Sequence, residues 1–224
     1  MTPAWPFWLL LAASAACAIA YGVRFLRAPP TLLRAAVKTG GVGFLALALY
    51  TERPSPLVLA LAFGALGDLA LAFDKKWTLP LGIFFFLLNQ LLYLAIFVGL
   101  WIMSVENLPA WASVGGAAAI GAFVVGYLLW LAPKLGALAF GVVPYALAIG
   151  AMAAMSLFID VRGWPAMLGA FLFLVSDGVL AAEIFRLSPD SPARKVTSPV
   201  VWWTYVAAQA LIVLGVVLAV QVMA

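Results

Sequence analysis

The sequence contains no histidine and only one cysteine, Cys17. A lone cysteine cannot form an internal disulfide, and a chain without histidine lacks the commonest zinc ligand, so we expect no metal site. The same absence leaves Ser156 and Ser176 without the histidine base of a catalytic triad, which argues against acyl-serine chemistry. The chain also has no glycine-rich phosphate loop, and we expect no organic cofactor. These absences make carboxylates the candidate catalytic groups.

Charged residues are scarce as well, at 9% of the chain, whereas a soluble globular domain carries about 25%. Hydrophobic residues make up 67%, and the mean hydropathy is +1.17. This composition predicts a protein that resides in a lipid bilayer. The isoelectric point of about 9.4 reflects basic residues in the loops. A positive-inside topology explains them better than nucleic-acid binding does.

Apolar stretches long enough to cross a bilayer recur along the whole chain, separated by proline, glycine or charged residues. We predict about eight spans, at residues 4–23, 35–50, 57–73, 79–102, 110–132, 136–159, 165–185 and 200–223. The first 23 residues contain no lysine or arginine, so we expect the first span to be retained rather than cleaved as a signal peptide. No loop could hold a soluble domain. The prediction is one all-α transmembrane domain over residues 1–224, with any activity inside the membrane.

Basic residues are distributed unevenly between the two sets of loops. Nine lie in the first, third, fifth and seventh loops, whereas only Arg53 and Arg162 lie in the others. The positive-inside rule places the odd-numbered loops in the cytosol and both termini outside it. We expect a multi-pass protein of the bacterial inner (cell) membrane.

Two aspartates interrupt the apolar stretches: Asp68 in GDLALA (67–72) and Asp177 in SDGVLA (176–181). A charged side chain in hydrocarbon costs at least ~2.5–3.5 kcal/mol, so a functional role is favoured for both. The two segments are similar and lie four spans apart, which indicates a 4+4 parallel internal repeat. Two carboxylates in a low dielectric tend to share one proton, which supplies a general acid and a general base.

Other polar side chains within the spans fall in the half expected to lie nearer the cytosol. We take them as candidate substrate-binding residues: Lys38, Asn89, Gln90, Tyr93, Tyr145, Tyr205 and Gln209. Each also has a structural interpretation. The lysine could extend to the membrane interface, and the amides and tyrosines could form hydrogen bonds between helices.

Six short motifs occur in order between residues 34 and 215: KTGG, GDLAL, NQLLYLAIF, PYALAIGAM, SDGVLAAEIF and TYVAAQALI. Together they resemble the YhhN/TMEM86 family of polytopic membrane proteins, whose characterised members are lysoplasmalogenases. Asp68 and Asp177 match the motif aspartates of that family, and Lys38 matches its lysine. Its tyrosine and polar partner in the last span match Tyr205 and Gln209.

This chain departs from the family pattern at two positions. Thr39 follows the lysine where proline is usual, and Gln90 stands where histidine is common. If that histidine takes part in the chemistry of other members, the mechanism or the substrate differs here.

The resemblance implies an ether hydrolase that cleaves the 1-alkenyl ether of a lysophospholipid to a fatty aldehyde and glycerophosphocholine or glycerophosphoethanolamine. In this hypothesis one neutral aspartate protonates the alkenyl carbon, while the other, ionised, activates water and stabilises the cation. The expected partners are the lysophospholipid substrate and membrane lipids. We expect no nucleic acid and no obligate protein partner.

Other functions use the same features. A proton-coupled lipid or solute carrier could employ the aspartates as a proton relay. An intramembrane aspartyl protease is less favoured, because Ala65 replaces the first glycine of the GxGD signature and no tyrosine precedes Asp177. An inactive family member would use the polar residues only to hold helices together.

Overall fold

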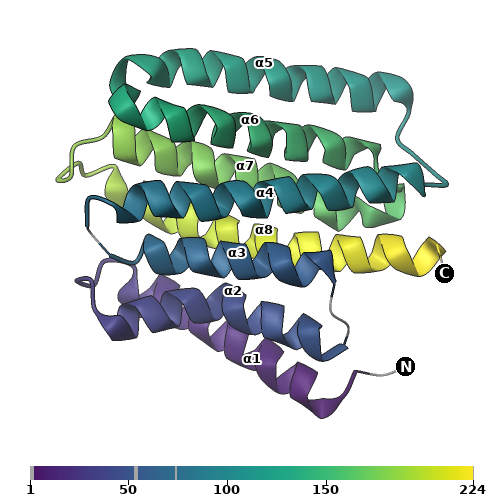
Figure 1. Ribbon diagram of the computed structural model, residues 1–224, viewed down its shortest axis with the longest axis horizontal. Helices are drawn as coiled ribbons and strands as arrows, with labels where there is room; N and C mark the ends of the chain where they lie inside the picture. The colour runs from purple at the N-terminus through teal and green to yellow at the C-terminus, as the bar shows by residue number, and fades with distance from the viewer. Residues whose placement is uncertain (1–2, 53–54, 74, 224) are drawn as a thin grey trace. The chain divides into compact units, whose positions relative to one another are not determined.

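The computed structural model describes residues 3–52, 55–73 and 75–223, and over these residues it contains helices and no strand (Figure 1). The all-α class is therefore confirmed. The α-helices are α1 (Trp5–Ala20), α2 (Leu32–Glu52), α3 (Pro56–Ala70), α4 (Thr78–Ile102), α5 (Ala110–Leu135), α6 (Ala139–Met155), α7 (Trp164–Phe185) and α8 (Arg194–Met223). Arg53, one of the two bases counted in the even-numbered loops, lies outside the described residues.

Six segments of the described chain are long and apolar enough to cross a membrane, so this is an integral membrane protein. They are Trp5–Phe25, Leu32–Glu52, Thr78–Ile102, Ala110–Phe158, Val161–Phe185 and Arg194–Gln221. The segment Ala110–Phe158 has 49 residues and includes both α5 and α6, whereas α3 has only 15 residues. The count of eight spans, their orientation and the internal repeat thus stay predictions.

The first compact unit spans residues 1–92 and contains α1, α2, α3 and the beginning of α4. Small residues let its helices approach closely. A Cβ atom added at Gly40 would lie 2.9 Å from the Cys17 sulfur on α1, and one at Gly67 would lie 2.6 Å from the Phe86 ring on α4. Glycine at these positions therefore lets the helices pack closely, as is common in membrane proteins.

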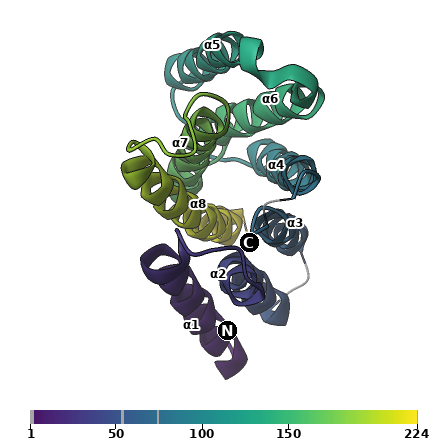
Figure 2. The same ribbon diagram turned by 90° about the vertical axis from the view of Figure 1, so that its left-hand side faces the viewer.

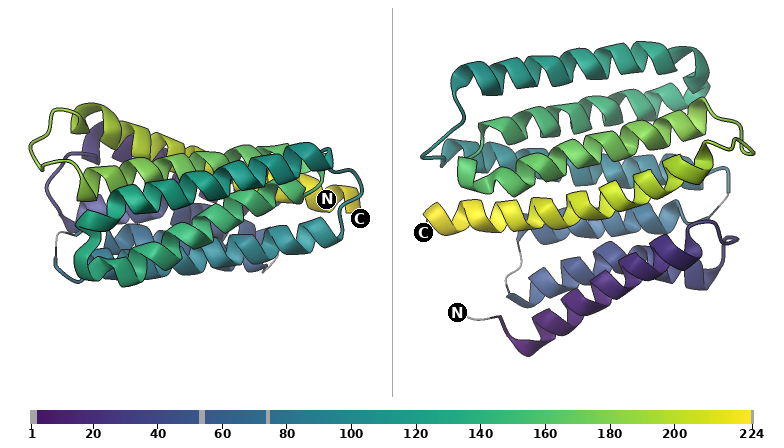
Figure 3. Two further views of the ribbon diagram at one scale, coloured as in Figure 1. Left: turned by 90° about the horizontal axis from the view of Figure 1, so that it is seen from above. Right: turned by 180° about the vertical axis from the view of Figure 1, so that it is seen from behind.

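The second compact unit spans residues 93–224 and contains the rest of α4 and α5 to α8. Helices α7 and α8 lie side by side in it (Figures 2 and 3). A Cβ atom at Gly215 would lie 2.1 Å from the Ala166 nitrogen, and one at Gly169 would lie 2.8 Å from the Ala208 oxygen. The two backbones are therefore in direct contact, with no room for a side chain between them.

Asp160, in the connection between α6 and α7, organises the loops at one end of this unit. Its buried carboxylate accepts hydrogen bonds from the backbone N–H groups of Val105, Glu106 and Arg162, at 3.3, 3.1 and 3.0 Å. Burial alone would raise the pKa of Asp160, but these donors and the Arg162 guanidinium together hold that pKa below its ordinary value. The carboxylate therefore ties the loop after α4 to the loop before α7.

Candidate functional site

A buried ion pair joins α2 to α3. Lys38 Nζ lies 3.5 Å from Asp68 Oδ1, and the two side chains are 12% and 3% exposed. The Lys38 ammonium also lies 6.0 Å from the centre of the Tyr21 ring. Lys38 could either extend to the membrane interface or face other helices, and this geometry favours the second interpretation. Its ammonium stabilises a carboxylate that the apolar span would otherwise disfavour.

Arg34 fixes the surroundings of this pair, one helical turn before Lys38 on α2. Its guanidinium donates to the Ala72 carbonyl at 2.9 Å, to the Tyr21 hydroxyl at 3.0 Å and to the Phe25 carbonyl at 3.2 Å. It thereby connects the end of the first span, the start of α2 and the turn after α3. Sequence reasoning gave no role to Tyr21, although the i, i+4 spacing of Arg34 and Lys38 places both bases on one face of α2.

The two adjacent amides of α4 are fully buried. Asn89 Nδ2 donates to the Ala60 carbonyl of α3 at 2.7 Å. Asn89 Oδ1 and both polar atoms of Gln90 have no hydrogen-bond partner among the residues that the structure describes. Buried polar atoms are rarely left in this state, because each loses its hydration without compensation. These atoms are therefore well suited to bind a polar group of a ligand.

In the second unit the hydroxyl of Tyr93 donates to Gln209 Oε1 on α8, and both side chains are buried. Gln209 Nε2 has no hydrogen-bond partner within the described part of the chain. Tyr205 lies one turn earlier on α8, where its ring packs edge-on against Phe173 at 5.4 Å between centroids. Two of the predicted site residues, Tyr93 and Gln209, are therefore hydrogen-bonded to each other. A third, Tyr205, lies one turn from Gln209 on α8.

Asp177 is partly buried on α7, directly after Ser176, whose hydroxyl donates to the Val201 carbonyl at 2.9 Å. Tyr145 is partly buried on α6. A shared site for the two aspartates stays a prediction. Over the described residues, no three carboxylate, thiol or imidazole groups gather into a set that could hold a metal ion.

These features define a polytopic, all-helical membrane protein with a buried lysine–aspartate pair and buried amide side chains inside its apolar helices. The profile of the YhhN family matches residues 33–216, and the chain belongs to that family. The resemblance drawn from the six motifs is confirmed.

Two relatives named lysoplasmalogenase, from Mycobacterium bovis (strain ATCC BAA-935 / AF2122/97) and Mycobacterium tuberculosis (strain CDC 1551 / Oshkosh), are each 30% identical over 162 residues. The match covers 71% of this chain but 59% of each relative, so the chain spans less than two thirds of their length. No solved structure matches the chain.

Proposed function

We propose that this protein is an intramembrane hydrolase that cleaves the vinyl ether bond of 1-alkenyl lysophospholipids. The products are a fatty aldehyde and glycerophosphocholine or glycerophosphoethanolamine. Family membership and the name of the two relatives support the reaction class. The observation that carries the proposal is the Lys38–Asp68 pair, because an ammonium beside a buried carboxyl group favours its charged form, which can act as a base for water.

The two aspartates take opposite roles in this proposal. The ammonium of Lys38 stabilises the carboxylate form of Asp68, which makes Asp68 the general base, and Asp177 is the general acid. The mechanism requires both carboxyl groups to reach the same ether bond.

The reaction then balances in three steps. Asp177 donates a proton to the alkenyl carbon remote from the ether oxygen, which produces an oxocarbenium ion. Water adds to the carbon that bears the oxygen, and Asp68 accepts the proton that the water loses, giving a hemiacetal. As the hemiacetal collapses, Asp68 returns its proton to the leaving glycerol oxygen, and Asp177 takes the proton of the hemiacetal hydroxyl. One water is consumed, and both carboxyl groups regain their initial state.

We propose that the buried amides of α4 bind the polar part of the substrate. Both polar atoms of Gln90 and the Asn89 oxygen are buried without a hydrogen-bond partner among the described residues, which suits them to the hydroxyl groups of the glycerol unit. In this proposal Gln90 supplies hydrogen bonds where the family commonly has an imidazole. Tyr145, Tyr205 and Gln209 are proposed to line the same substrate. The natural membrane is proposed to be the bacterial inner membrane.

The test is aldehyde release from 1-alkenyl lysophosphoethanolamine by the purified protein in detergent. Asp68→Asn and Asp177→Asn are each expected to lower the rate by at least ~10²-fold, because each removes one proton-transfer group. Asp190→Asn, at an exposed loop position, is the matched control and should retain the wild-type rate. Size-exclusion chromatography establishes that each variant is folded.

Two results would contradict the proposal. A folded wild-type protein that releases no aldehyde is not a lysoplasmalogenase under these conditions. Full activity in either aspartate variant would exclude the two-carboxyl mechanism while leaving the reaction itself intact. Proton-driven uptake of lipid or solute into proteoliposomes, without aldehyde release, would identify a carrier instead.

A further inference from the structure

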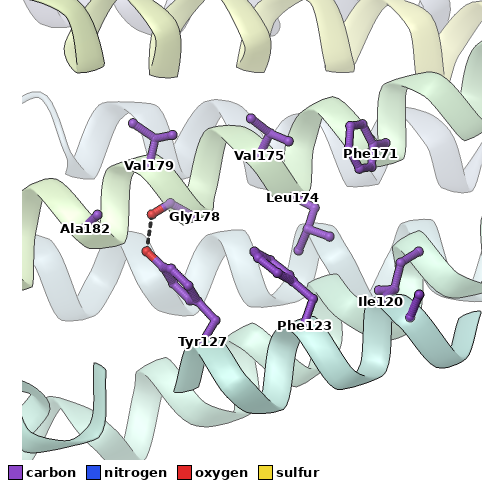
Figure 4. A pocket seen from close by; sticks show the side chains of 10 residues that line it. Ile120, Phe123, Tyr127, Phe171, Leu174, Val175, Gly178, Val179 and Ala182 are labelled. Atoms are coloured by element: carbon purple, nitrogen blue, oxygen red, sulfur yellow. Dashed lines mark hydrogen bonds between the residues drawn. The ribbon is translucent and has the colours of Figure 1, made fainter. Parts of the chain in front are cut away.

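An apolar groove of about 520 Å³ lies between α5 and α7 (Figure 4). Phe123 and Tyr127 of α5 point toward Leu174 and Gly178 of α7. Phe171, Val175 and Val179 of α7 also line the groove. The one hydroxyl in the groove, that of Tyr127, donates to the Gly178 carbonyl and so offers no free donor to a ligand. Because both helices belong to segments that can span a membrane, the groove suits a hydrocarbon chain.

The groove has a cationic end. Arg186 follows the groove-lining Ala182 by one turn of α7, and its guanidinium carbon lies 4.5 Å from the centre of the Trp130 ring, one turn beyond Tyr127 on α5. Arg186 Nε is buried and has no hydrogen-bond partner among the residues described. Lys134 is exposed one turn past Trp130, in the last turn of α5. Two cations and an unused donor therefore lie at one end of an apolar groove.

This groove is distinct from the proposed catalytic residues. The α7 residues that line it recur at 171, 174, 175, 178, 179 and 182, which is the spacing of a single helix face. Asp177 is displaced from Gly178 by about 100° around the helix axis and is not among the lining residues. An occupant of the groove would contact α5 and α7 without using the carboxyl group.

We propose that this groove is a binding site for an anionic membrane phospholipid. One acyl chain lies between α5 and α7, and the phosphate binds Arg186, with Lys134 supplying a second positive charge. Arginine donates paired hydrogen bonds to phosphate, and basic pockets between membrane helices bind anionic head groups in this way. The bound lipid would fill the groove and hold α5 against α7. The inference does not depend on the hydrolase activity.

The structure offers a substitution that fills the groove without a clash. A Cβ atom added at Gly178 would meet no atom of the described residues within 4 Å, and the same is true of Gly126 on α5, which does not line the groove. Gly178→Leu therefore blocks the acyl chain, and Gly126→Leu makes the same chemical change elsewhere. Arg186→Gln removes the phosphate ligand, and Lys195→Gln removes an equal charge from an exposed position in the first turn of α8.

The experiment is native mass spectrometry of the delipidated protein in detergent, titrated with phosphatidylglycerol or with phosphatidylcholine of the same chains. We expect one phosphatidylglycerol to bind tightly, and phosphatidylcholine more weakly. Gly178→Leu should weaken both by roughly tenfold or more, and Arg186→Gln should weaken phosphatidylglycerol by about tenfold, since it removes a charged hydrogen bond. Both control variants should bind as the wild type does.

Three outcomes would overturn the proposal. Equal affinity for the two lipids would exclude the anionic head-group site. An equal loss in Arg186→Gln and Lys195→Gln would show a diffuse effect of surface charge. Unchanged binding in Gly178→Leu would show that no chain enters the groove. If Gly178→Leu does not fold, Ala182→Leu fills the same groove one turn further along α7 and decides the point.

Discussion

Replacement of Lys38 by methionine tests the buried ion pair directly. Methionine keeps a long, unbranched apolar side chain but removes the ammonium, so Asp68 loses the charge that lies 3.5 Å from its carboxylate. Asp68 is 2% exposed, and water therefore cannot replace the lost partner. The substitution therefore removes the cationic partner of a carboxyl group that is buried among apolar helices.

The expected loss follows from the distance and the burial. Two unit charges 3.5 Å apart attract each other by about 5 kcal/mol at an effective dielectric constant near 20. Part of this attraction is offset by the dehydration of both groups. Removing one member of a buried pair typically costs about 3–5 kcal/mol. We expect Lys38→Met to lower the free energy of unfolding by about 3 kcal/mol.

A double-mutant cycle separates the pair from the individual side chains. Asp68→Asn should cost less than Lys38→Met, because the Lys38 side chain is 12% exposed and keeps some hydration. The double variant should be more stable than the sum of the single losses predicts, with a coupling energy of about 2 kcal/mol. The assay is unfolding of the purified protein by sodium dodecyl sulfate in mixed micelles. Lys76→Met, at an exposed loop position, is the matched control.

Additive losses, within about 0.5 kcal/mol, would refute the reasoning. In that case Lys38 and Asp68 would contribute independently, and the ion pair could not be what stabilises the carboxylate within the apolar helices. A loss in Lys76→Met as large as that in Lys38→Met would show that removal of any lysine destabilises the protein in the micelle.

Three further predictions concern helix packing, the pH dependence of stability and a buried hydrogen bond. Gly215→Ala should lower the free energy of unfolding by about 3 kcal/mol, since its Cβ would lie 2.1 Å from the α7 backbone, whereas Gly126→Ala should be neutral or stabilising. The depressed pKa of Asp160 gives a stabilising contribution that is complete above the unfolded-state pKa of about 3.9. It is lost as the pH falls through the folded-state value. Thermal melts at several acidic pH values should show this loss in the wild type and not in Asp160→Asn. Tyr93→Phe leaves the Gln209 amide oxygen without its donor and should cost about 1–3 kcal/mol in the same unfolding assay; an unchanged stability would mean that this hydrogen bond contributes nothing.

The site as a whole was only partly predictable from the sequence. Asp68 and Asp177 could be singled out because a carboxyl group in an apolar stretch is costly wherever the stretch lies in the fold. Gln90 could be singled out for the same reason. The sequence could not show that its polar atoms have no hydrogen-bond partner among the described residues. Tyr21 gave no signal, because a tyrosine near the end of a span is ordinary in a membrane protein.

The sequence by itself determined the helical class and the approximate positions of the helices. In a bilayer every backbone N–H and C=O group of a spanning segment must be satisfied within that segment, so the apolar stretches are helices whatever surrounds them. Their ends were less certain: α8 begins at Arg194, ahead of the apolar stretch that starts at residue 200, because polar residues can extend a helix beyond the hydrocarbon.

Only the tertiary structure decided which polar groups meet. Lys38 and Asp68 are 30 residues apart on different helices, and Tyr93 and Gln209 are 116 residues apart. Hydropathy shows little of how a membrane helix is rotated about its axis, because a helix that is apolar all round has no preferred face. That rotation is set by close contacts such as Gly67 against the Phe86 ring, and it determines which side chains face each other.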